Sequence, residues 1–257
     1  VAGGVCLALS IGIYQAYLAF AMLLCIYAIL MLVMEQGSIK EKVQSSLKYL
    51  YMGICGAGIY YVVLQILLKV QGKELGSYQG AETVGTGNQA GLLETIKNMY
   101  VDFFGFTLKG NVLANNVFSY VAIGLLAVAV LVVLVLMAGK KKWFAKPWIY
   151  LFVVLLVIGL PVATNIILLI LPEVTYHTLM RYQWVLFPIL MIAFVDKYGK
   201  EVSPNKFTIS VEWAVLLSVI VLIWNYTVTD NIAYSNMQKK YEKTYAYCLR
   251  LLDRIEQ

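Results

Sequence analysis

The chain has 257 residues, of which 61% are hydrophobic and 13% charged, and its mean hydropathy is +0.77. This composition places it among polytopic membrane proteins. The net charge of +6 does not indicate nucleic-acid binding, because the basic residues lie in loops between apolar runs, where they act as topology signals.

The cysteines and the chain ends add further limits. Cys6, Cys25, Cys55 and Cys248 lie far apart, so they predict neither a metal site nor a disulfide framework. The chain opens with VAGGVCLALS, which has no initiator methionine, basic segment or cleavage site and is therefore not a signal peptide. It ends at DRIEQ within a predicted helix. We expect an internal fragment of a longer protein.

The first part of the chain predicts one partial and two complete membrane spans. Residues 1–13 are apolar but too short to cross about 30 Å of hydrocarbon, whereas residues 14–34 and 48–68 are long enough. Tyr14 and Gln15 bring polar groups to the turn between the first two segments. Gln15 alone also fits an ordinary helix end that faces lipid headgroups.

A glycine-rich loop and an amphipathic helix follow. Residues 71–91 lack an apolar run, and no Gly-Lys-Ser/Thr follows their glycines, so they predict a long lid-like or binding loop and not a phosphate-binding P-loop. Residues 92–106 predict a helix lying in the membrane surface. Its apolar positions are Leu92, Leu93, Ile96, Met99, Tyr100, Phe103 and Phe104, and its polar side is Glu94, Lys97, Asn98 and Asp102.

The rest of the chain predicts further spans and a polar tail. Four apolar runs cover residues 117–137, 147–171 (with a kink expected at Pro161), 181–195 and 207–224. Residues 227–257 predict a polar helix that begins an extracytoplasmic domain, after a glycosylation sequon at Asn225 that carries little weight. The predicted fold class is therefore all-α, a polytopic transmembrane helical bundle with an interfacial helix.

The distribution of lysines predicts the orientation of this bundle. The short loops at 35–48, 139–147 and 196–207 are rich in lysine, which places them in the cytoplasm by the positive-inside rule. The Tyr14–Gln15 turn, the loop at 71–115, the 172–182 stretch and the tail then all face outward. Every candidate functional element falls on that one side.

The stretch LPEVTYHTLMRYQW, residues 171–184, is the most informative of these elements. His177 and Arg181 are four residues apart, which at helical spacing puts them on one face. Tyr176, Tyr182 and Trp184 flank them, as aromatic residues do at a membrane boundary. Cations at that depth suit a phosphate with a lipid tail. The alternative is that Arg181 only snorkels to the interface and His177 is an ordinary loop residue.

Three segments together resemble a known family: SIGIYQAYLAF at 10–20, TLMRYQWVLFP at 178–188 and NMQKKYEKTYAYCLRLLDRIEQ at 236–257. They look like the bacterial type-two Gtr glucosyltransferases, polytopic enzymes of the GT-C architecture. The resemblance implies transfer of glucose, or a similar hexose, from polyprenyl-phosphate-glucose to a cell-surface polysaccharide such as O-antigen. It places the active site outward on the bacterial cytoplasmic (inner) membrane, with membrane lipid, the lipid-linked sugar and the polysaccharide as partners.

The resemblance also implies roles for individual residues. The family uses an acidic residue as base or metal anchor, in an outer loop that we expect upstream of Val1. A divalent cation is possible, although no metal-binding residues are assigned. Arg181 and His177 are expected to bind the donor phosphate, and Tyr14, Gln15 and Tyr176 to contact sugar or lipid. The outward acids are expected to be solvated loop carboxylates: Glu74, Glu82, Glu94, Asp102 and Glu173.

Two other classes fit the apolar spans. A flippase or transporter of lipid-linked sugars should place charges inside its spans, whereas the nearest charge here, Glu212, lies close to a cytoplasmic end. A non-catalytic scaffold gives no reason for the polar elements to gather on one side. An outer loop upstream of Val1 with one or two acids would favour the enzyme.

Overall fold

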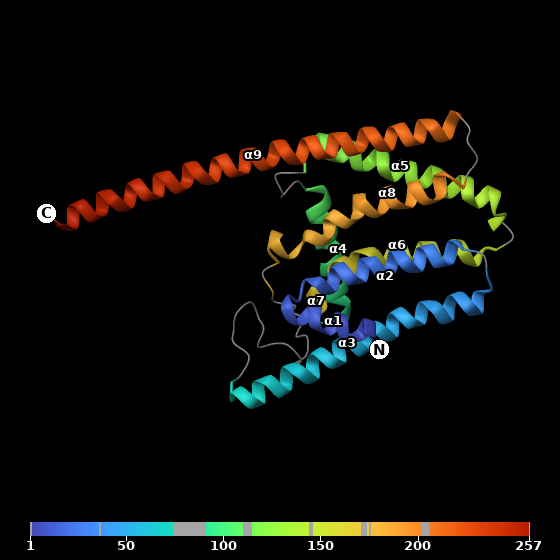
Figure 1. Cartoon of the computed structure of the whole chain (residues 1–257), viewed down its shortest axis with the longest axis horizontal. Helices are drawn as coiled ribbons and strands as arrows, with labels where there is room; N and C mark the ends of the chain where they lie inside the picture. The colour runs from blue at the N-terminus through green and yellow to red at the C-terminus, as the bar shows by residue number, and fades with distance from the viewer. Residues whose placement is uncertain are drawn as a thin grey trace. The chain divides into compact units, whose positions relative to one another are not determined.

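The computed structural model describes residues 2–35, 37–73, 91–109, 115–143, 146–170, 174, 176–201 and 206–256. Within these residues every element is helical and none is a strand, which confirms the predicted all-α class (Figure 1). In this described part of the chain, four helices are long and apolar enough to cross a membrane: Tyr17–Met34, Ile39–Gln71, Val117–Lys140 and Ile209–Glu256. The chain divides into two units, Val1–Gly105 with Val135–Ala193, and Phe106–Leu134 with Phe194–Gln257.

Helices of the first unit pack closely where small residues allow it. The unit contains α1 (Ala2–Ile13), α2 (Tyr17–Met34), α3 (Ile39–Gln71) and α6 (Trp148–Thr164). α1 lies against α3, and a Cβ atom added at Gly56 would lie 2.8 Å from a methyl carbon of Leu7. Because the two backbones approach where Gly56 has no side chain, α1 is held to the bundle although it is too short to span by itself.

Two lysines complete the C-terminal end of α2. The last carbonyls of a helix have no partner within it. Here the Lys42 ammonium donates to the carbonyls of Val33, at 2.6 Å, and Glu35, while Lys141 donates to that of Met34 at 3.2 Å. Lys42 lies within α3, which begins at Ile39 inside the predicted polar loop 35–48. These contacts bring two of the lysine-rich segments together at one end of the unit.

A capping box sets the start of α3 earlier than expected. Ser38 accepts from the backbone N–H of Glu41, and the Glu41 carboxylate accepts from the N–H of Ser38. This reciprocal arrangement satisfies two N–H groups that would otherwise lack partners. The helix therefore extends nine residues before the apolar run that begins at residue 48.

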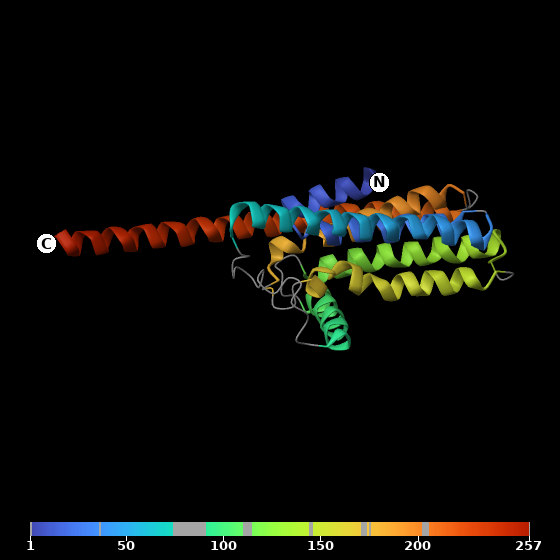
Figure 2. The same cartoon turned by 90° about the horizontal axis from the view of Figure 1, so that it is seen from below.

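Short elements make up the opposite end of the first unit. α4 (Leu92–Leu108) runs across the direction of α2 and α6 (Figure 2). α6 continues through Pro161 and ends at Thr164, and α7 (Ile167–Ile170) follows. The chain then forms the 3₁₀ turns η3 (Thr178–Met180) and η4 (Tyr182–Val185) before α8 (Leu186–Gly199).

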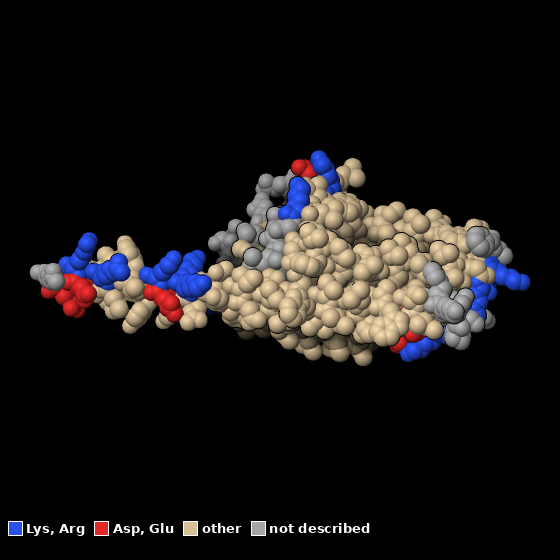
Figure 3. Space-filling model, turned by 90° about the horizontal axis from the view of Figure 1, so that it is seen from above, with Lys and Arg blue, Asp and Glu red and all other residues tan. Residues whose placement is uncertain are grey.

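The second unit contains most of α5 (Val117–Lys140) and the single helix α9 (Lys206–Glu256). The Asn116 side chain accepts from the Ser119 N–H and donates to the side-chain oxygen Oδ1 of Asn225 at 2.5 Å, which ties the start of α5 to α9. Asn225 is buried, so its sequon is not an accessible acceptor. The C-terminal part of α9 carries mixed Lys, Arg, Asp and Glu side chains (Figure 3).

Candidate functional site

The buried face of α4 supplies the acidic residue of the site. Thr95 and Met99 are buried and lie four residues apart, and Asp102 continues this stripe one turn later. The Asp102 side chain is 27% exposed. The prediction that Asp102 is a solvated carboxylate on the polar side of this helix is therefore wrong. Glu94, Lys97 and Asn98 are exposed, as predicted for that side.

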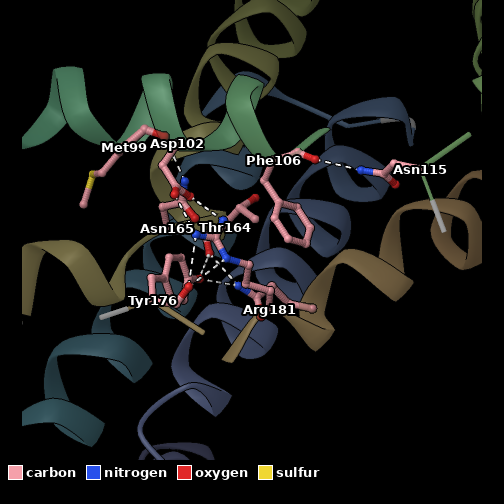
Figure 4. A network of polar contacts seen from close by, with 9 residues as sticks. Met99, Asp102, Phe106, Asn115, Thr164, Asn165, Tyr176 and Arg181 are labelled. Carbon is pink, nitrogen blue, oxygen red and sulfur yellow. Dashed lines mark hydrogen bonds and ion pairs between the residues drawn. The ribbon is translucent and has the colours of Figure 1, made fainter. Parts of the chain in front are cut away.

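Asp102 forms a two-pronged ion pair with Arg181 (Figure 4). Arg181 Nη1 donates to Asp102 Oδ2 and Nη2 donates to Oδ1, each at 2.6 Å. Two parallel charge-assisted hydrogen bonds of this kind fix the orientation of both groups. Arg181 and Asp102 are 79 residues apart in sequence, so only the fold brings them together.

The Arg181 guanidinium is anchored independently of Asp102. Its Nε and Nη2 atoms both donate to the Tyr176 carbonyl at 3.3 Å, and its Cζ lies 4.0 Å from the centre of the Tyr176 ring. The Trp184 ring centre lies 5.7 Å from the same carbon. Attraction between a cation and an aromatic face strengthens as water is excluded. With 9% of its side chain exposed, Arg181 does not snorkel to solvent.

The local backbone separates Arg181 from His177. His177 has an extended conformation (φ −72°, ψ 157°) at the start of η3, and the 3₁₀ turn ends at Arg181. The stretch is not an α-helix, so the expectation that these two residues share a helical face is wrong. The His177 side chain is exposed, whereas Arg181 is buried.

Buried amides support the segment that carries Arg181. Gln183 Nε2 donates to the Thr164 carbonyl at 2.9 Å and to the Tyr176 hydroxyl at 2.7 Å. Asn165 Nδ2 donates to the Met99 carbonyl at 2.8 Å and so links the end of α6 to α4. These bonds position both partners of the Asp102–Arg181 pair.

The Tyr176 hydroxyl forms two hydrogen bonds within this network. It donates to the Thr164 carbonyl at 3.3 Å and accepts from Gln183. Burial raises the pKa of Tyr176 to about 12, against the smaller opposing effect of the Gln183 hydrogen bond. The phenol therefore stays neutral at physiological pH and serves as a hydrogen-bonding group without charge.

The turn between α1 and α2 contributes an aromatic cluster beside this network. Tyr14 and Tyr176 both pack against a buried cluster of Ala16, Ile167, Val174 and Met180. The Tyr14 ring stacks on Tyr182 with ring centres 6.4 Å apart. Gln15 points elsewhere, because its Nε2 donates to the Tyr60 hydroxyl on α3 at 3.3 Å.

Several buried oxygens remain available for further hydrogen bonds. Among the described residues, Asn165 Oδ1, Gln183 Oε1 and the Tyr182 hydroxyl have no hydrogen-bond partner. The amide nitrogens of Asn165 and Gln183 face carbonyls, which fixes the orientation of both amides. Both amide oxygens are acceptors that a hydroxyl group can satisfy.

The structure thus brings together three of the five predicted contact residues: Arg181, Tyr176 and Tyr14. Gln15 lies on the same turn as Tyr14, and His177 is exposed. Glu74, Glu82 and Glu173 lie outside the described residues. In the described part of the chain, no group of three or more His, Cys, Asp and Glu side chains could hold a metal ion. The individual roles assigned to these residues stay predictions.

Sequence reasoning missed Asp102, Gln183 and Asn165 as members of one network. For Asp102 a signal was present, since positions 95, 99 and 102 fall on one helical face and the first two are uncharged. An acid on the buried face of an amphipathic helix needs a partner. For Gln183 and Asn165 no periodicity distinguishes a buried amide from one at a helix end.

The sequence matches the family described as Glucosyl transferase GtrII over residues 1–195. This match covers about three quarters of the chain, including α4 and the whole Asp102–Arg181 network. The chain belongs to the GtrII glucosyl transferase family. It matches no curated protein and no solved structure.

Membership of the GtrII family confirms the resemblance found in the sequence. It implies glucosyltransferase activity, and the long apolar helices indicate a membrane protein. A glucosyltransferase must hold an activated sugar and stabilise its leaving group. The polar network around Arg181 lies within the residues that match the GtrII family.

Proposed function

We propose that this GtrII member transfers glucose, or a similar hexose, from a polyprenyl-phosphate donor to a cell-surface polysaccharide such as O-antigen. In this proposal it is a GT-C enzyme of the bacterial cytoplasmic membrane, and its site faces outward. The observation that carries the proposal is the buried Arg181 guanidinium, anchored by the Tyr176 carbonyl and already paired with a two-oxygen anion.

The chemistry of the donor explains why an arginine fits this position. Transfer breaks the bond between the sugar carbon and a phosphate oxygen, so negative charge develops on the departing polyprenyl phosphate. A guanidinium with limited access to water can grip two phosphate oxygens and stabilise that charge. The Asp102 carboxylate is bound in the same two-oxygen geometry, with each oxygen 2.6 Å from one terminal nitrogen of Arg181.

The placement of the network agrees with an outward site. α4 and the η3–η4 segment lie at the end of the first unit opposite the contacts of Lys42 and Lys141 (Figures 1 and 2). If lysine-rich loops are cytoplasmic, the opposite end faces outward. Tyr14 and His177 also lie at that end, as secondary sugar or lipid contacts beside the donor phosphate. Gln15 lies on the same turn as Tyr14 and is a more distant candidate, because its side chain donates to Tyr60.

Transfer assays on the full-length protein test this proposal. Membranes containing the enzyme are supplied with labelled polyprenyl-phosphate-glucose, and labelled polysaccharide is measured per folded protein. Arg181→Ala should lower transfer roughly 10- to 150-fold, the equivalent of about 1.5–3 kcal/mol for a lost charge-assisted hydrogen bond. Arg181→Lys should retain part of the activity, because it keeps the charge but loses the planar two-pronged grip.

Arg250→Ala is the matched control, since Arg250 is an exposed arginine of α9. It should leave transfer unchanged. Wild-type transfer by both Arg181 variants would remove Arg181 from the donor site. Transfer from a nucleotide-sugar donor, with none from the lipid-linked donor, would contradict the proposed substrate class.

A further inference from the structure

The two terminal nitrogens of Arg181, Nη1 and Nη2, form a fork that would bind the donor phosphate. This fork is already occupied in the structure. Both terminal nitrogens donate to Asp102, while Nε and Nη2 together donate to the Tyr176 carbonyl. A phosphate diester held by two nitrogens would therefore need the two terminal nitrogens that Asp102 binds. A diester phosphate also carries the same single negative charge as a carboxylate. The donor phosphate and Asp102 therefore cannot occupy the fork in this geometry at the same time.

We propose that Asp102 is a positioning residue that holds the fork in the substrate-free protein and is displaced by the donor phosphate. This inference rests on the proposed function, because it assumes that Arg181 binds the donor. In the free protein Asp102 places a carboxylate against the buried guanidinium, and burying a charge is costly unless it is paired. The exchange replaces one anion in the fork by another.

The two partners of the pair are held unequally. Arg181 is 9% exposed and keeps its bonds to the Tyr176 carbonyl and its place over the Tyr176 ring when Asp102 leaves. Asp102 is 27% exposed, three times the fraction of Arg181, so the carboxylate lies nearer to water. Hydration then compensates the released carboxylate, whereas the guanidinium has no comparable access.

In this proposal Asp102 leaves the fork by a change of side-chain rotamer. The α4 backbone next to Asp102 is tied to α6 through the bond from Asn165 to the Met99 carbonyl, which does not involve the Asp102 side chain. Rotation about the two side-chain torsions of Asp102 can move the carboxylate away while α4 stays in place. The fork is thus exchanged without repacking the bundle.

Binding of polyprenyl-phosphate-glucose, the donor diester, to the purified full-length protein tests the exchange. Asp102→Asn removes the competing charge but keeps the shape, so it should tighten binding at least about tenfold, whereas Arg181→Ala should weaken it. If Arg181→Ala weakens binding and Asp102→Asn leaves it unchanged or weaker, the exchange is wrong and the donor-phosphate role of Arg181 stands. If Arg181→Ala has no effect on binding, the proposed role of Arg181 itself fails.

Two matched variants separate charge from general effects. Asp196→Asn removes a carboxylate of an exposed pair, with Lys200 at 2.5 Å, and should leave binding unchanged. Asp102→Glu keeps the negative charge and should not tighten binding as Asp102→Asn does. Equal tightening by Asp102→Glu would show that loss of the charge is not the cause and would overturn the exchange.

A measurement on the wild-type protein remains decisive if Asp102→Asn does not fold. Carbodiimide coupling of an amine to Asp102, followed by peptide mass spectrometry, reports how accessible the carboxylate is. Saturating polyprenyl-phosphate-glucose should increase labelling of Asp102 several-fold and leave that of Asp196 constant. Unchanged or reduced labelling of Asp102 would overturn the displacement.

Discussion

Arg181 and Lys42 are both buried cations of the first unit, but their partners differ in kind. Lys42 is 5% exposed and donates to backbone carbonyls at the end of α2, with the Trp148 ring centre 5.0 Å away. Arg181 donates to the side chain of Asp102 as well as to a backbone carbonyl. Lys42 therefore completes a helix end, whereas Arg181 belongs to a pair with one movable member.

This difference suggests how to tell a structural cation from a functional one. Carbonyls at a helix C-terminus are fixed by the fold and carry a partial negative charge, so a lysine there stabilises the helix and cannot exchange partners. A carboxylate on another element can leave if a better-placed anion arrives. Substitutions at the two positions should accordingly affect different measurements.

The largest expected difference concerns which side of the membrane each end faces. In a full-length protein whose native cysteines are replaced, His177→Cys should be labelled in intact cells by an impermeant maleimide. Gln44→Cys, close to Lys42, should be labelled only after permeabilisation. Both side chains are exposed, so access by the reagent depends on sidedness. Labelling of position 44 from outside would reverse the orientation and the outward placement of the site.

Loss of Lys42 should affect stability and not transfer. Lys42→Met removes the donor to two carbonyls and should lower the free energy of unfolding by about 1–3 kcal/mol. Thermal unfolding in detergent measures this change, and transfer per folded protein should stay at the wild-type level. Lys40→Met, at an exposed position on the same helix, is the control. A transfer defect in folded Lys42→Met would contradict its structural assignment.

Gln183 supports Arg181 indirectly, so its loss should have a smaller effect than that of Arg181→Ala. Gln183→Leu removes the hydrogen bonds to the Thr164 carbonyl and the Tyr176 hydroxyl. The free energy of unfolding should fall by about 1–2 kcal/mol. Transfer should fall several-fold, because the Tyr176 carbonyl that accepts from Arg181 would be held less firmly. Gln44→Leu serves as the exposed control. Unchanged transfer would show that the amide only fills space.

The smallest effect is expected at His177. A neutral imidazole offers one donated hydrogen bond and no fixed charge, and the residue is exposed. His177→Ala should therefore reduce transfer about fivefold at most, equivalent to one ordinary hydrogen bond. The same assay as for the Arg181 variants applies. A fall as large as that of Arg181→Ala would place His177 directly on the donor.

Much of the fold could be predicted from local patterns. Apolar runs and their lysine-rich borders predicted helices in the right regions, and the three-to-four spacing in residues 92–106 predicted α4 closely. Helix ends were harder, because they depend on short-range polar bonds. The Ser38–Glu41 capping box extends α3 into the expected loop, and 3₁₀ turns replace regular helix around Arg181.

The sequence by itself determined that this is an all-α membrane protein of the GtrII type with a candidate cation at Arg181, since composition and short motifs are local properties. Only the tertiary structure decided that Arg181 is buried, that Asp102 is its counter-ion and that Asn165 and Gln183 support both. The physical reason is that the free-energy cost of burying a charge depends on the groups that surround it in space. Residues 79 positions apart share no local pattern that could reveal such a pair.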